Sequence, residues 1–315
     1  MRILLIGNKG FLGSSVEKEL FKNYNPKEIF LASLSTGFDL RDYSQVKKLF
    51  EEVRPEIVIN CAAHVGGIQY GLSNAARIFH DNTQMILNIF KGASDYQVKR
   101  LINPISNCAY PGKLEIYEES FFWDGPVDDS VFTYGNTRRL MMVAAKSYLT
   151  QDKLDTVSIV FPNLYGPRDH FDEYKSHALG ALISKIMKAK ETGKKSVTIW
   201  GSGKPIREWL YIDDAARAIV NAIKIKPYPE VINLGTGKGV SIIEMAEKIR
   251  DIADWQGSFT FDQTKKDGAP KKIIEGTRGN LILGINNFVD FNKGLRKTLD
   301  FYIENYIKRW WTDEN

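Results

Sequence analysis

The sequence predicts an α/β protein with a doubly wound parallel sheet and a smaller α/β lobe toward the C-terminus. Three observations predict it. The chain opens with a short apolar strand at residues 2–7 that leads into regularly spaced glycines. Segments rich in Val, Ile and Leu then alternate with amphipathic segments up to residue 163, as in parallel β–α units whose helices cover both faces of a sheet. Beyond residue 163 the alternation becomes irregular.

Each β–α unit of the first half has its own apolar pattern. Strands are expected at residues 2–7, 28–33, 56–63, 99–106 and 155–163, and helices at 14–24, 44–53, 76–96 and 133–149. Short branched-residue strands, each followed by a segment of helical period, indicate a sheet of the Rossmann type. Pro104 is the exception, because a proline in a central strand removes a ladder hydrogen bond.

The second half predicts a different lobe. Helical patterns cover residues 176–190, 241–253 and 294–306, and a further helical pattern follows the motif at 207–214. Short strands are expected at 196–200 and 230–235. Residues 262–272 are turn-rich and basic. We expect a cofactor-binding domain at residues 1–163, to which residues about 212–235 return. Residues 164–315 should form mainly a substrate-binding lobe. Ligands of such sheets bind beyond the carboxyl ends of the strands, so this lobe should cover that edge.

Composition excludes several classes of protein. The 315 residues carry a net charge of +5, with basic side chains scattered among acidic ones rather than clustered as in a nucleic-acid-binding surface. No apolar segment reaches the roughly 18 residues of a membrane span, and the first strand is too short for a signal peptide. Two cysteines, Cys61 and Cys108, do not make a disulfide framework. We expect a cytoplasmic protein that binds neither nucleic acid nor membrane.

The segment Gly7-x-x-Gly10-x-x-Gly13 follows the first strand and opens the first helix. Bare backbone amides and the positive end of a helix dipole make such a turn a binding site for phosphate. The spacing is looser than G-x-G-x-x-G, and a tight turn without a ligand is the alternative. Because strand, glycines and helix follow in register, we predict that this turn binds a dinucleotide.

The end of the second strand indicates which dinucleotide is bound. An NAD site has an acidic residue there that binds the ribose 2′-hydroxyl, whereas this chain has LASLS at residues 31–35. Ser33 and Ser35 can donate hydrogen bonds to a 2′-phosphate, and Lys9 in the glycine segment can add positive charge. We therefore predict NADP as the cofactor.

Further motifs carry polar side chains. They are SNC at 106–108, Tyr134 and Arg138 one helical turn apart, PNLYGP at 162–167, and WGSGKPIREWLYIDD at 200–214. Together with CAAHVGGI at 61–68, Ser176-His177 and KKDGAPKK at 265–272, these motifs resemble the extended short-chain dehydrogenase/reductase family. Within that family they are most similar to the dual epimerases and reductases of nucleotide sugars. The resemblance covers nearly the whole chain.

Ketone reduction fits the polar residues. Hydride addition builds negative charge on the carbonyl oxygen, and a phenol can protonate that oxygen if its anion is stabilised. Arg138, one turn from Tyr134, favours the phenolate, and Ser106 can donate a second hydrogen bond. We predict Tyr134 as the acid, Arg138 as its electrostatic partner and ribose ligand, and Ser106 as the oxyanion donor. Taken alone, Tyr134 also fits a core aromatic residue.

Arg138 departs from the Tyr-x-x-x-Lys pattern of the family. Arginine keeps the positive charge and can bind ribose hydroxyls, but it hardly ever releases a proton, which argues against a proton relay through this residue. Arg139 follows directly, so either guanidinium could occupy the site.

By resemblance, Cys108 and His177 match the epimerisation pair of the family. A thiolate can remove a proton next to a ketone, and an imidazolium can return one on the opposite face. Each residue also has an ordinary interpretation, Cys108 as a small core residue and His177 as a neighbour of a helix cap. His64 and His80 are interpreted as structural, and no spacing of His, Cys, Asp or Glu suggests a metal.

The resemblance also assigns contacts to the sugar nucleotide. Its diphosphate suits arginine and lysine, and its base can stack on a tryptophan. The family often has arginine where this chain has Lys185, and serine where it has Asn107. The residues assigned to the substrate are Asn163, His177, Lys185, Trp200, Arg207 and Lys266.

Contacts to the cofactor are expected along the edge where the strands of the first domain end. They include the glycine segment, the end of the second strand and the loop after the third. The residues assigned to NADP are Gly7, Lys9, Gly10, Phe11, Leu12, Gly13, Ser33, Asp39, Leu40, Ala62, Ala63, His64, Tyr134, Arg138, Pro162 and Leu164.

The resemblance implies NADPH-dependent reduction at C4 of a GDP- or dTDP-linked 4-keto-6-deoxy sugar, with 3,5-epimerisation. One alternative is a 4-ketoreductase without epimerisation, for example on a dTDP sugar. Another is an NAD-retaining epimerase or dehydratase, although such dehydratases carry Thr-Asp-Glu where this chain has SNC at 106–108. A third is a non-catalytic cofactor-binding protein, which Arg138 permits. Relatives are commonly homodimers that pair through helices like those at 74–95 and 133–150.

Overall fold

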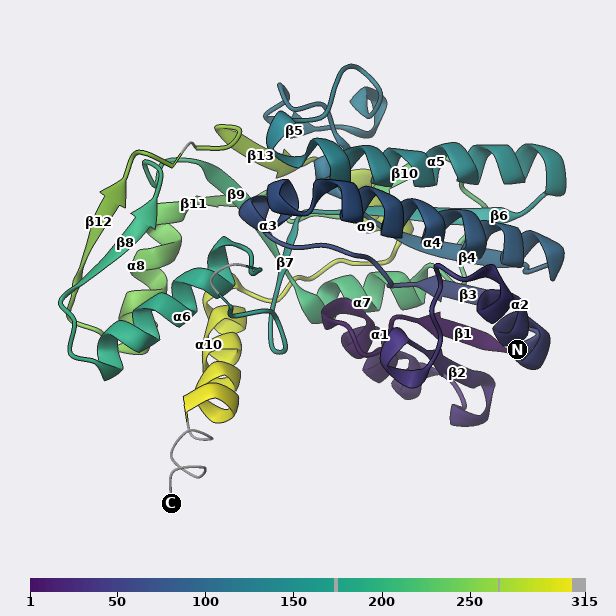
Figure 1. Cartoon of the computed structure of the whole chain (residues 1–315), viewed down its shortest axis with the longest axis horizontal. Helices are drawn as coiled ribbons and strands as arrows, with labels where there is room; N and C mark the ends of the chain where they lie inside the picture. The colour runs from purple at the N-terminus through teal and green to yellow at the C-terminus, as the bar shows by residue number, and fades with distance from the viewer. Residues whose placement is uncertain (173–174, 266, 308–315) are drawn as a thin grey trace.

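A six-stranded, fully parallel sheet dominates the computed structural model, which describes residues 1–172, 175–265 and 267–307 (Figure 1). The strand order is β10-β6-β4-β3-β1-β2. The predicted Rossmann-type fold class is confirmed. The strands are β1 (Ile3–Ile6), β2 (Ile29–Ala32), β3 (Ile57–Asn60), β4 (Arg100–Ser106), β6 (Asp155–Phe161) and β10 (Val231–Asn233).

Helices cover both faces of this sheet: α1 (Phe11–Asn23) and α7 (Ile212–Asn221) on one, and α2 (Tyr43–Val53), α4 (Ala75–Asp95) and α5 (Phe132–Asp152) on the other. The strands separate these layers because successive residues point to opposite faces. On β1, Ile3 and Leu5 join the core under α1 and α7, whereas Leu4 and Ile6 join the core under α2, α4 and α5. Figure 1 shows α4 and α5 side by side.

Pro104 lies within β4, a central strand. The pairing of β3 with β4 runs only from Arg100 to Ile102, whereas β6 pairs as far as Ser106. Pro104 therefore sits where a single neighbouring strand remains, which limits the ladder hydrogen bonds that its missing N–H can remove.

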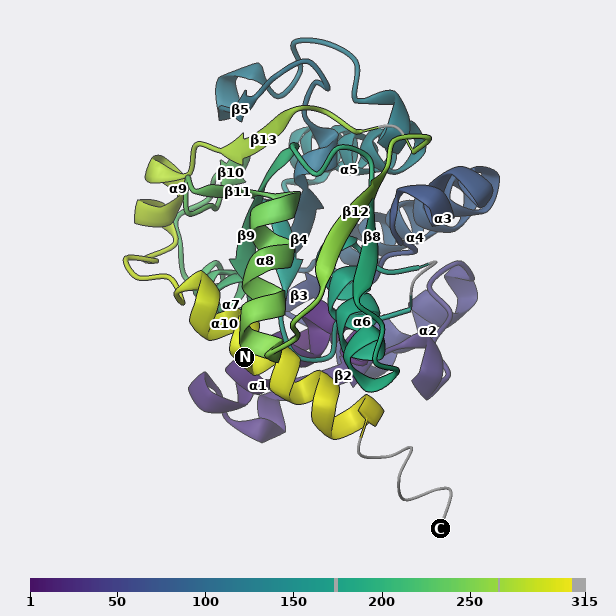
Figure 2. The same cartoon turned by 90° about the vertical axis from the view of Figure 1, so that its left-hand side faces the viewer.

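A second, mixed sheet in the order β11-β9-β13-β5, with β7 paired to β9, forms the smaller lobe that faces the viewer in Figure 2. Strands β12 and β8 form a separate parallel pair. Of these strands the sequence predicted only β8 as a separate element. The strands are β5 (Ile116–Tyr117), β7 (Asn163–Tyr165), β8 (Ser196–Trp200), β9 (Ile206–Tyr211), β11 (Gly239–Ser241), β12 (Ser258–Asp262) and β13 (Lys271–Ile274).

Three helices share the core of this lobe: α6 (Ala178–Glu191), α8 (Ile242–Ala253) and α10 (Phe291–Tyr302). Local sequence starts two of them. Ser241 and Glu244 form a capping box at the start of α8, and the Asp290 side chain accepts the Lys293 N–H at the start of α10.

The chain crosses between the lobes more than once. Helix α7 packs against α1, and β10 pairs with β6 and packs against α9 (Thr277–Ile282). Conversely, β5 comes before β6 in the chain but pairs with β13 in the second sheet. This exchange of segments ties the lobes together. Across the described ranges, no helix combines the length and apolar character needed to span a bilayer.

Candidate active site

The glycine segment forms a close turn between β1 and α1. Gly7 has φ +80°, and a Cβ on it would lie 2.7 Å from the Ala62 nitrogen; a Cβ on Gly13 would lie 2.1 Å from the Gly7 carbonyl oxygen. Gly10 begins α1 without a side-chain cap, and the first turn has no acidic residue. The backbone of this turn is therefore open to an anionic group.

The end of β2 is free of carboxylates at the position where an NAD site has one. Ser33 is buried, and its hydroxyl lies 3.0 Å from that of Ser35. The next acidic residue, Asp39, binds Arg41 through two oxygens, and these hydrogen bonds lower the pKa of the Asp39 carboxyl. The carbonyl of the buried Leu40 accepts a 2.9 Å hydrogen bond from Asn88.

Tyr134 and Arg138 lie on one side of α5, as their spacing predicts. The guanidinium carbon of Arg138 is 4.9 Å from the centre of the Tyr134 ring. Burial raises the pKa of Tyr134, while the charge of Arg138 opposes that rise. Tyr134 therefore holds its proton at neutral pH, as a general acid must.

Arg138 is only 3 % exposed. Its Nη2 donates to Asn82 Oδ1 at 2.9 Å, and its buried Nε has no partner. A buried cation with an unused donor is costly without a further acceptor, so the residue is suited to a ligand hydroxyl.

Asn82, on α4, is a site residue that the sequence analysis missed. Besides Arg138, its Oδ1 accepts the His64 N–H at 3.1 Å, and its Nδ2 donates to the His64 carbonyl at 2.8 Å. Asn82 thus joins α5 to the loop after β3. The His64 ring lies between Asp81 and the Tyr70 hydroxyl, 2.8 Å from each, and His80 Nδ1 lies 3.4 Å from Asp81.

Ser106 and Cys108 stand where β4 ends. Ser106 Oγ accepts the Cys108 N–H at 3.2 Å, and a Cβ on Gly135 would lie 2.4 Å from the Cys108 carbonyl oxygen. The first turn of α5 therefore abuts the Cys108 backbone. A negative charge on Cys108 raises the pKa of Tyr134. The thiol and the phenol are therefore close enough to interact electrostatically.

The second lobe places basic side chains near Cys108. Burial lowers the pKa of Arg207, on β9, while the nearby Tyr117, Asp128 and Cys108 oppose this change. Lys272 is buried and pairs with Arg207 in the β13–β9 register. Burial acts to raise the pKa of Asp128, but hydrogen bonds with Ser130 and the charges of Lys272 and Arg207 leave it lowered. The sequence analysis missed Lys272, for which the basic segment at 262–272 was a signal.

His177 is the N-cap residue of α6, and its side chain makes no capping hydrogen bond. The side chain reaches solvent, yet the protein packed around it lowers the pKa of the imidazole, and His170 adds to this effect. The segment just before it is held by the Gly67 N–H, which donates to the Lys175 carbonyl at 2.9 Å. The loop after β3 is thus attached to the segment that carries His177.

The residues assigned to the nucleotide lie mostly on the second lobe. Trp200 is 47 % exposed, and the Nζ atoms of Lys185 and Lys265 lie 4.6 and 5.4 Å from its ring centre. Asn163 Nδ2 donates to the Glu208 carbonyl at 3.0 Å. The structure thus brings Lys185 and Trp200 together. Lys266 lies outside the described residues.

Arg139 points away from the site. Its guanidinium donates to three main-chain carbonyls, those of Ala109 at 2.7 Å, Gly125 at 2.7 Å and Phe122 at 3.0 Å. Of the two adjacent arginines, only Arg138 stands beside Tyr134.

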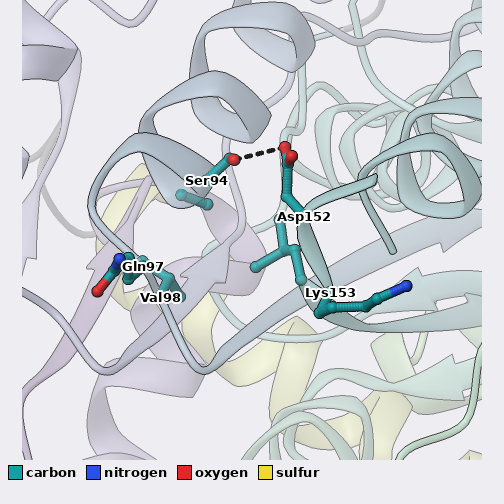
Figure 3. Close-up of a pocket in the computed structure, with 7 residues that line it drawn as sticks. Ser94, Gln97, Val98, Asp152 and Lys153 are labelled. Carbon is teal, nitrogen blue, oxygen red and sulfur yellow. Dashed lines mark hydrogen bonds between the residues drawn. The ribbon is translucent and has the colours of Figure 1, made fainter. Parts of the chain in front are cut away.

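A separate hollow of about 300 Å³ lies where α4 and α5 end (Figure 3). Ser94 Oγ donates to Asp152 at 2.6 Å across it, and Gln97 and Lys153 also line it. These residues precede the first residues of β4 and β6, so the hollow lies at the edge opposite to Ser106 and Cys108. It is not part of the candidate site.

Comparison with known proteins shows the family to which the chain belongs. Residues 3–235 match the NAD dependent epimerase/dehydratase family. A GDP-L-fucose synthase of Sinorhizobium fredii is 32 % identical, with 96 % of both chains covered. A putative GDP-L-fucose synthase 2 of Arabidopsis thaliana is 31 % identical, with 98 % of this chain and 93 % of the relative covered. A GDP-L-fucose synthetase of Naegleria fowleri, solved with NADP, has a TM-score of 0.84 and 29 % identity over 97 % of this chain and 94 % of that one. This chain belongs to the NAD dependent epimerase/dehydratase family.

Proposed function

We propose that this protein epimerises C3 and C5 of a GDP-linked 4-keto-6-deoxy sugar and then reduces C4 with NADPH. The observation that carries the proposal is the meeting of three side chains from separate elements: Tyr134 on α5, Cys108 after β4 and Arg207 on β9. They supply an acid, a thiol and a cation for an anionic substrate. The names of relatives that share nearly the whole chain support GDP as the nucleotide.

NADP fits the residues of the large sheet. The glycine turn leaves no room for side chains and offers bare amides at the start of α1. The hydroxyls of Ser33 and Ser35 lie at the end of β2, where an acid would repel a 2′-phosphate. The unpartnered Nε of Arg138 suits a ribose hydroxyl. We propose that residues 1–163 and about 212–235 bind the cofactor and that the remaining lobe binds the sugar nucleotide.

In the reduction, NADPH supplies the hydride that adds to C4. Tyr134 donates its phenolic proton to the C4 oxygen as the carbonyl bond is reduced, and the Arg138 charge stabilises the phenolate left behind. Ser106 donates a hydrogen bond to the same oxygen. Because arginine hardly ever deprotonates, Arg138 acts as a fixed charge, and Tyr134 regains its proton from solvent.

In each epimerisation, the Cys108 thiolate removes a proton from the carbon next to the ketone and becomes a thiol. The electron pair of the broken C–H bond moves to the C4 oxygen as an enolate, where Ser106 and Tyr134 hydrogen-bond it. The His177 imidazolium then protonates the opposite face of the carbon and becomes neutral. Solvent restores both groups, so deuterium from the solvent enters at C3 and C5.

The Tyr134→Phe variant tests the reductase. With a GDP-4-keto-6-deoxy sugar, we expect NADPH oxidation to fall by about 10²- to 10⁴-fold, the usual contribution of a general acid. Undiminished oxidation would overturn the proposal. In D₂O, wild-type product without deuterium at C3 and C5 would instead indicate a 4-ketoreductase without epimerisation. Cofactor binding without turnover of any sugar nucleotide would indicate a binding protein.

Cofactor choice has its own test. Ser35 is exposed at the end of β2, so Ser35→Asp adds a negative charge without disturbing the core. We expect the Kd of NADPH to rise about tenfold, as for one repulsive charge at a solvated site, while the Kd of NADH hardly changes. Ser35→Ala is the control. An equal effect on both cofactors would contradict NADP as the natural ligand.

We propose further that the protein is a cytoplasmic homodimer that pairs through α4 and α5. Phe79 and Leu87 on α4, and Phe132 and Val143 on α5, are 47–58 % exposed. Phe79 and Phe132 line one hollow of about 430 Å³ between the first turns of the two helices. Large side chains exposed along two neighbouring helices indicate a surface that another protein covers, and a second copy would present the same surface.

Sedimentation of charged variants tests the dimer. Leu87→Glu and Val143→Glu should give a monomer, because they bury charges in the interface. Leu281→Glu, on α9, is the control, since Leu281 is 77 % exposed and lies outside α4 and α5. A wild-type monomer at micromolar concentration would contradict the proposal.

A further inference from the structure

We propose that a C-terminal aromatic cluster, defined as Phe171, Phe301, Tyr302 and Tyr306, positions His177 for proton transfer to the sugar. The end of the chain would thereby govern epimerisation separately from reduction. Phe171 and Tyr306 are positioning residues in this proposal, since they touch neither cofactor nor substrate. The inference rests on the proposed function, in which His177 is the proton donor.

Phe171 is the point where the cluster holds the segment before α6. It is 3 % exposed, and its ring centre lies 4.9 Å from that of Tyr302 and 5.3 Å from that of Tyr306. Tyr302 and Tyr306 stack on each other at 5.1 Å, and Phe301 lies 6.5 Å from Phe171. Aromatic contacts at these distances stabilise the packing beyond the burial of apolar area. The contacts of Phe171 with the end of α10 and the residues after it therefore fix the position of the segment before α6.

Hydrogen bonds join Asp172, next to Phe171, to the two residues that precede His177. The carbonyl of Asp172, the next residue, accepts the Ser176 N–H at 2.9 Å and also accepts the Ser176 hydroxyl. The Asp172 carboxylate accepts the Lys175 N–H at 2.8 Å. His177 follows Ser176 directly and is the N-cap residue of α6, so these hydrogen bonds couple the position of Phe171 to that of the imidazole.

The groups proposed for reduction stand on other elements. Tyr134 and Arg138 are on α5 and Ser106 ends β4. Among the described residues, the ring and hydrogen-bond contacts of these three side chains are with residues outside the cluster. On its other side the His177 segment contacts the residues that follow β3: the Gly67 N–H donates to the Lys175 carbonyl, and Lys175 Nζ lies 5.8 Å from the centre of the Tyr70 ring. Loosening the cluster should therefore displace His177 and leave the reducing groups in place.

The test compares two rates in the same enzyme. Phe171→Leu and the milder Tyr306→Leu, at a side chain 43 % exposed, are assayed in D₂O for deuterium entry at C3 and C5. NADPH oxidation is measured in parallel with a substrate that is already epimerised. We expect exchange to fall about tenfold relative to reduction for Phe171→Leu, because small misplacements of a reacting group are costly, and about threefold for Tyr306→Leu.

Phe259→Leu is the matched control. Phe259 packs on Trp255 at 5.8 Å in the core of the same lobe, so its loss tests destabilisation of the lobe alone and should leave the ratio of the two rates unchanged. An unchanged ratio in both cluster variants would overturn the inference while the proposed function stands. No exchange in the wild type would instead defeat the epimerisation on which it rests.

A second readout needs no substrate. The NMR resonances of the His177 ring, assigned with His177→Asn, should titrate at a higher pH in Phe171→Leu and Tyr306→Leu, because a displaced imidazole regains water. Unshifted His177 resonances in both variants would also overturn the inference.

Discussion

Two consecutive arginines on α5 face different regions and have different hydrogen-bond partners. Arg139 holds the segment between β4 and α5 in place, because its three guanidinium nitrogens donate hydrogen bonds to the main-chain carbonyls of Ala109, Phe122 and Gly125. Arg138 is more deeply buried, and among the described residues its guanidinium has one hydrogen-bond partner, Asn82, and an Nε without a partner. The two side chains carry the same charge, but Arg139 is only partly buried and has more hydrogen-bond acceptors around it than Arg138.

The difference teaches how to separate a structural cation from one that awaits a ligand. A buried charge whose donors are all satisfied is part of the scaffold, whereas one left short of acceptors has a cost that a bound molecule can remove. The same contrast holds for two buried carboxyls. Glu208 accepts hydrogen bonds from Thr236, Gly237 and Ile274. Within the described part of the chain, Asp169 accepts the His170 N–H alone, and its Oδ2 has no partner there.

Arg138→Met should give the largest effect. Removing the charge beside Tyr134 leaves the phenolate unstabilised, and we expect single-turnover reduction to fall about 10²- to 10³-fold. Unfolding in urea should change by no more than about 1 kcal/mol, since a poorly paired buried charge contributes little to stability. Normal reduction by the folded variant would show that the site does not need Arg138.

Arg139→Met should do the reverse. Three carbonyls lose a charged donor, so we expect the free energy of unfolding to fall by about 3 kcal/mol. Reduction per folded molecule, measured at a temperature where the variant is native, should stay within about twofold of wild type. Lost activity with unchanged stability would exchange the roles assigned to the two arginines.

Asp169→Asn extends the comparison to pH. Burial raises the pKa of Asp169 to about 7, so the folded wild type holds this proton more tightly than the unfolded chain does. Its stabilising contribution is complete below the unfolded pKa of about 4 and is lost as the pH rises through about 7. We expect the free energy of unfolding to fall by about 2 kcal/mol from pH 5 to pH 7.

The Asn variant cannot titrate, so this contribution to the slope should be missing from its urea denaturation series. A slope equal to that of the wild type would mean that Asp169 is already ionised in the native protein at pH 5.

Arg138→Lys should have the smallest effect. Lysine restores the Tyr-x-x-x-Lys pattern and keeps a positive charge, so we expect reduction to remain within about tenfold of wild type. Because an ammonium group can release a proton, the variant should gain a dependence of rate on pH above 8 that the wild type lacks. A loss as large as that of Arg138→Met would mean that the guanidinium shape, and not its charge, is what the site requires.

The large sheet was accessible to sequence reasoning because its strands are apolar runs separated by helices in simple alternation. The second sheet was not. β5 has two residues, Ile116 and Tyr117, whose partners Ile273 and Ile274 lie far along the chain. A strand this short carries no periodic signal, and its pairing depends on contacts that no local segment encodes.

The candidate site divides in the same way. Glycine spacing, the helical interval between Tyr134 and Arg138, and the residue types at 106–108 could be read from the sequence, because each is a local pattern. Asn82 could not, since an amide on α4 has no distinguishing neighbours. The basic segment at 262–272 was a signal for Lys272, but it did not separate this lysine from the others in the segment.

By itself, the sequence determined the α/β alternation, the glycine turn after β1 and the absence of an acid after β2, because local periodicity and residue type carry that information. Only the tertiary structure decided between Arg138 and Arg139, since the choice depends on which carbonyls surround each guanidinium. It also decided that Arg207 and Cys108, on separate sheets, share one neighbourhood. Long-range packing sets those distances, and no spacing along the chain records them.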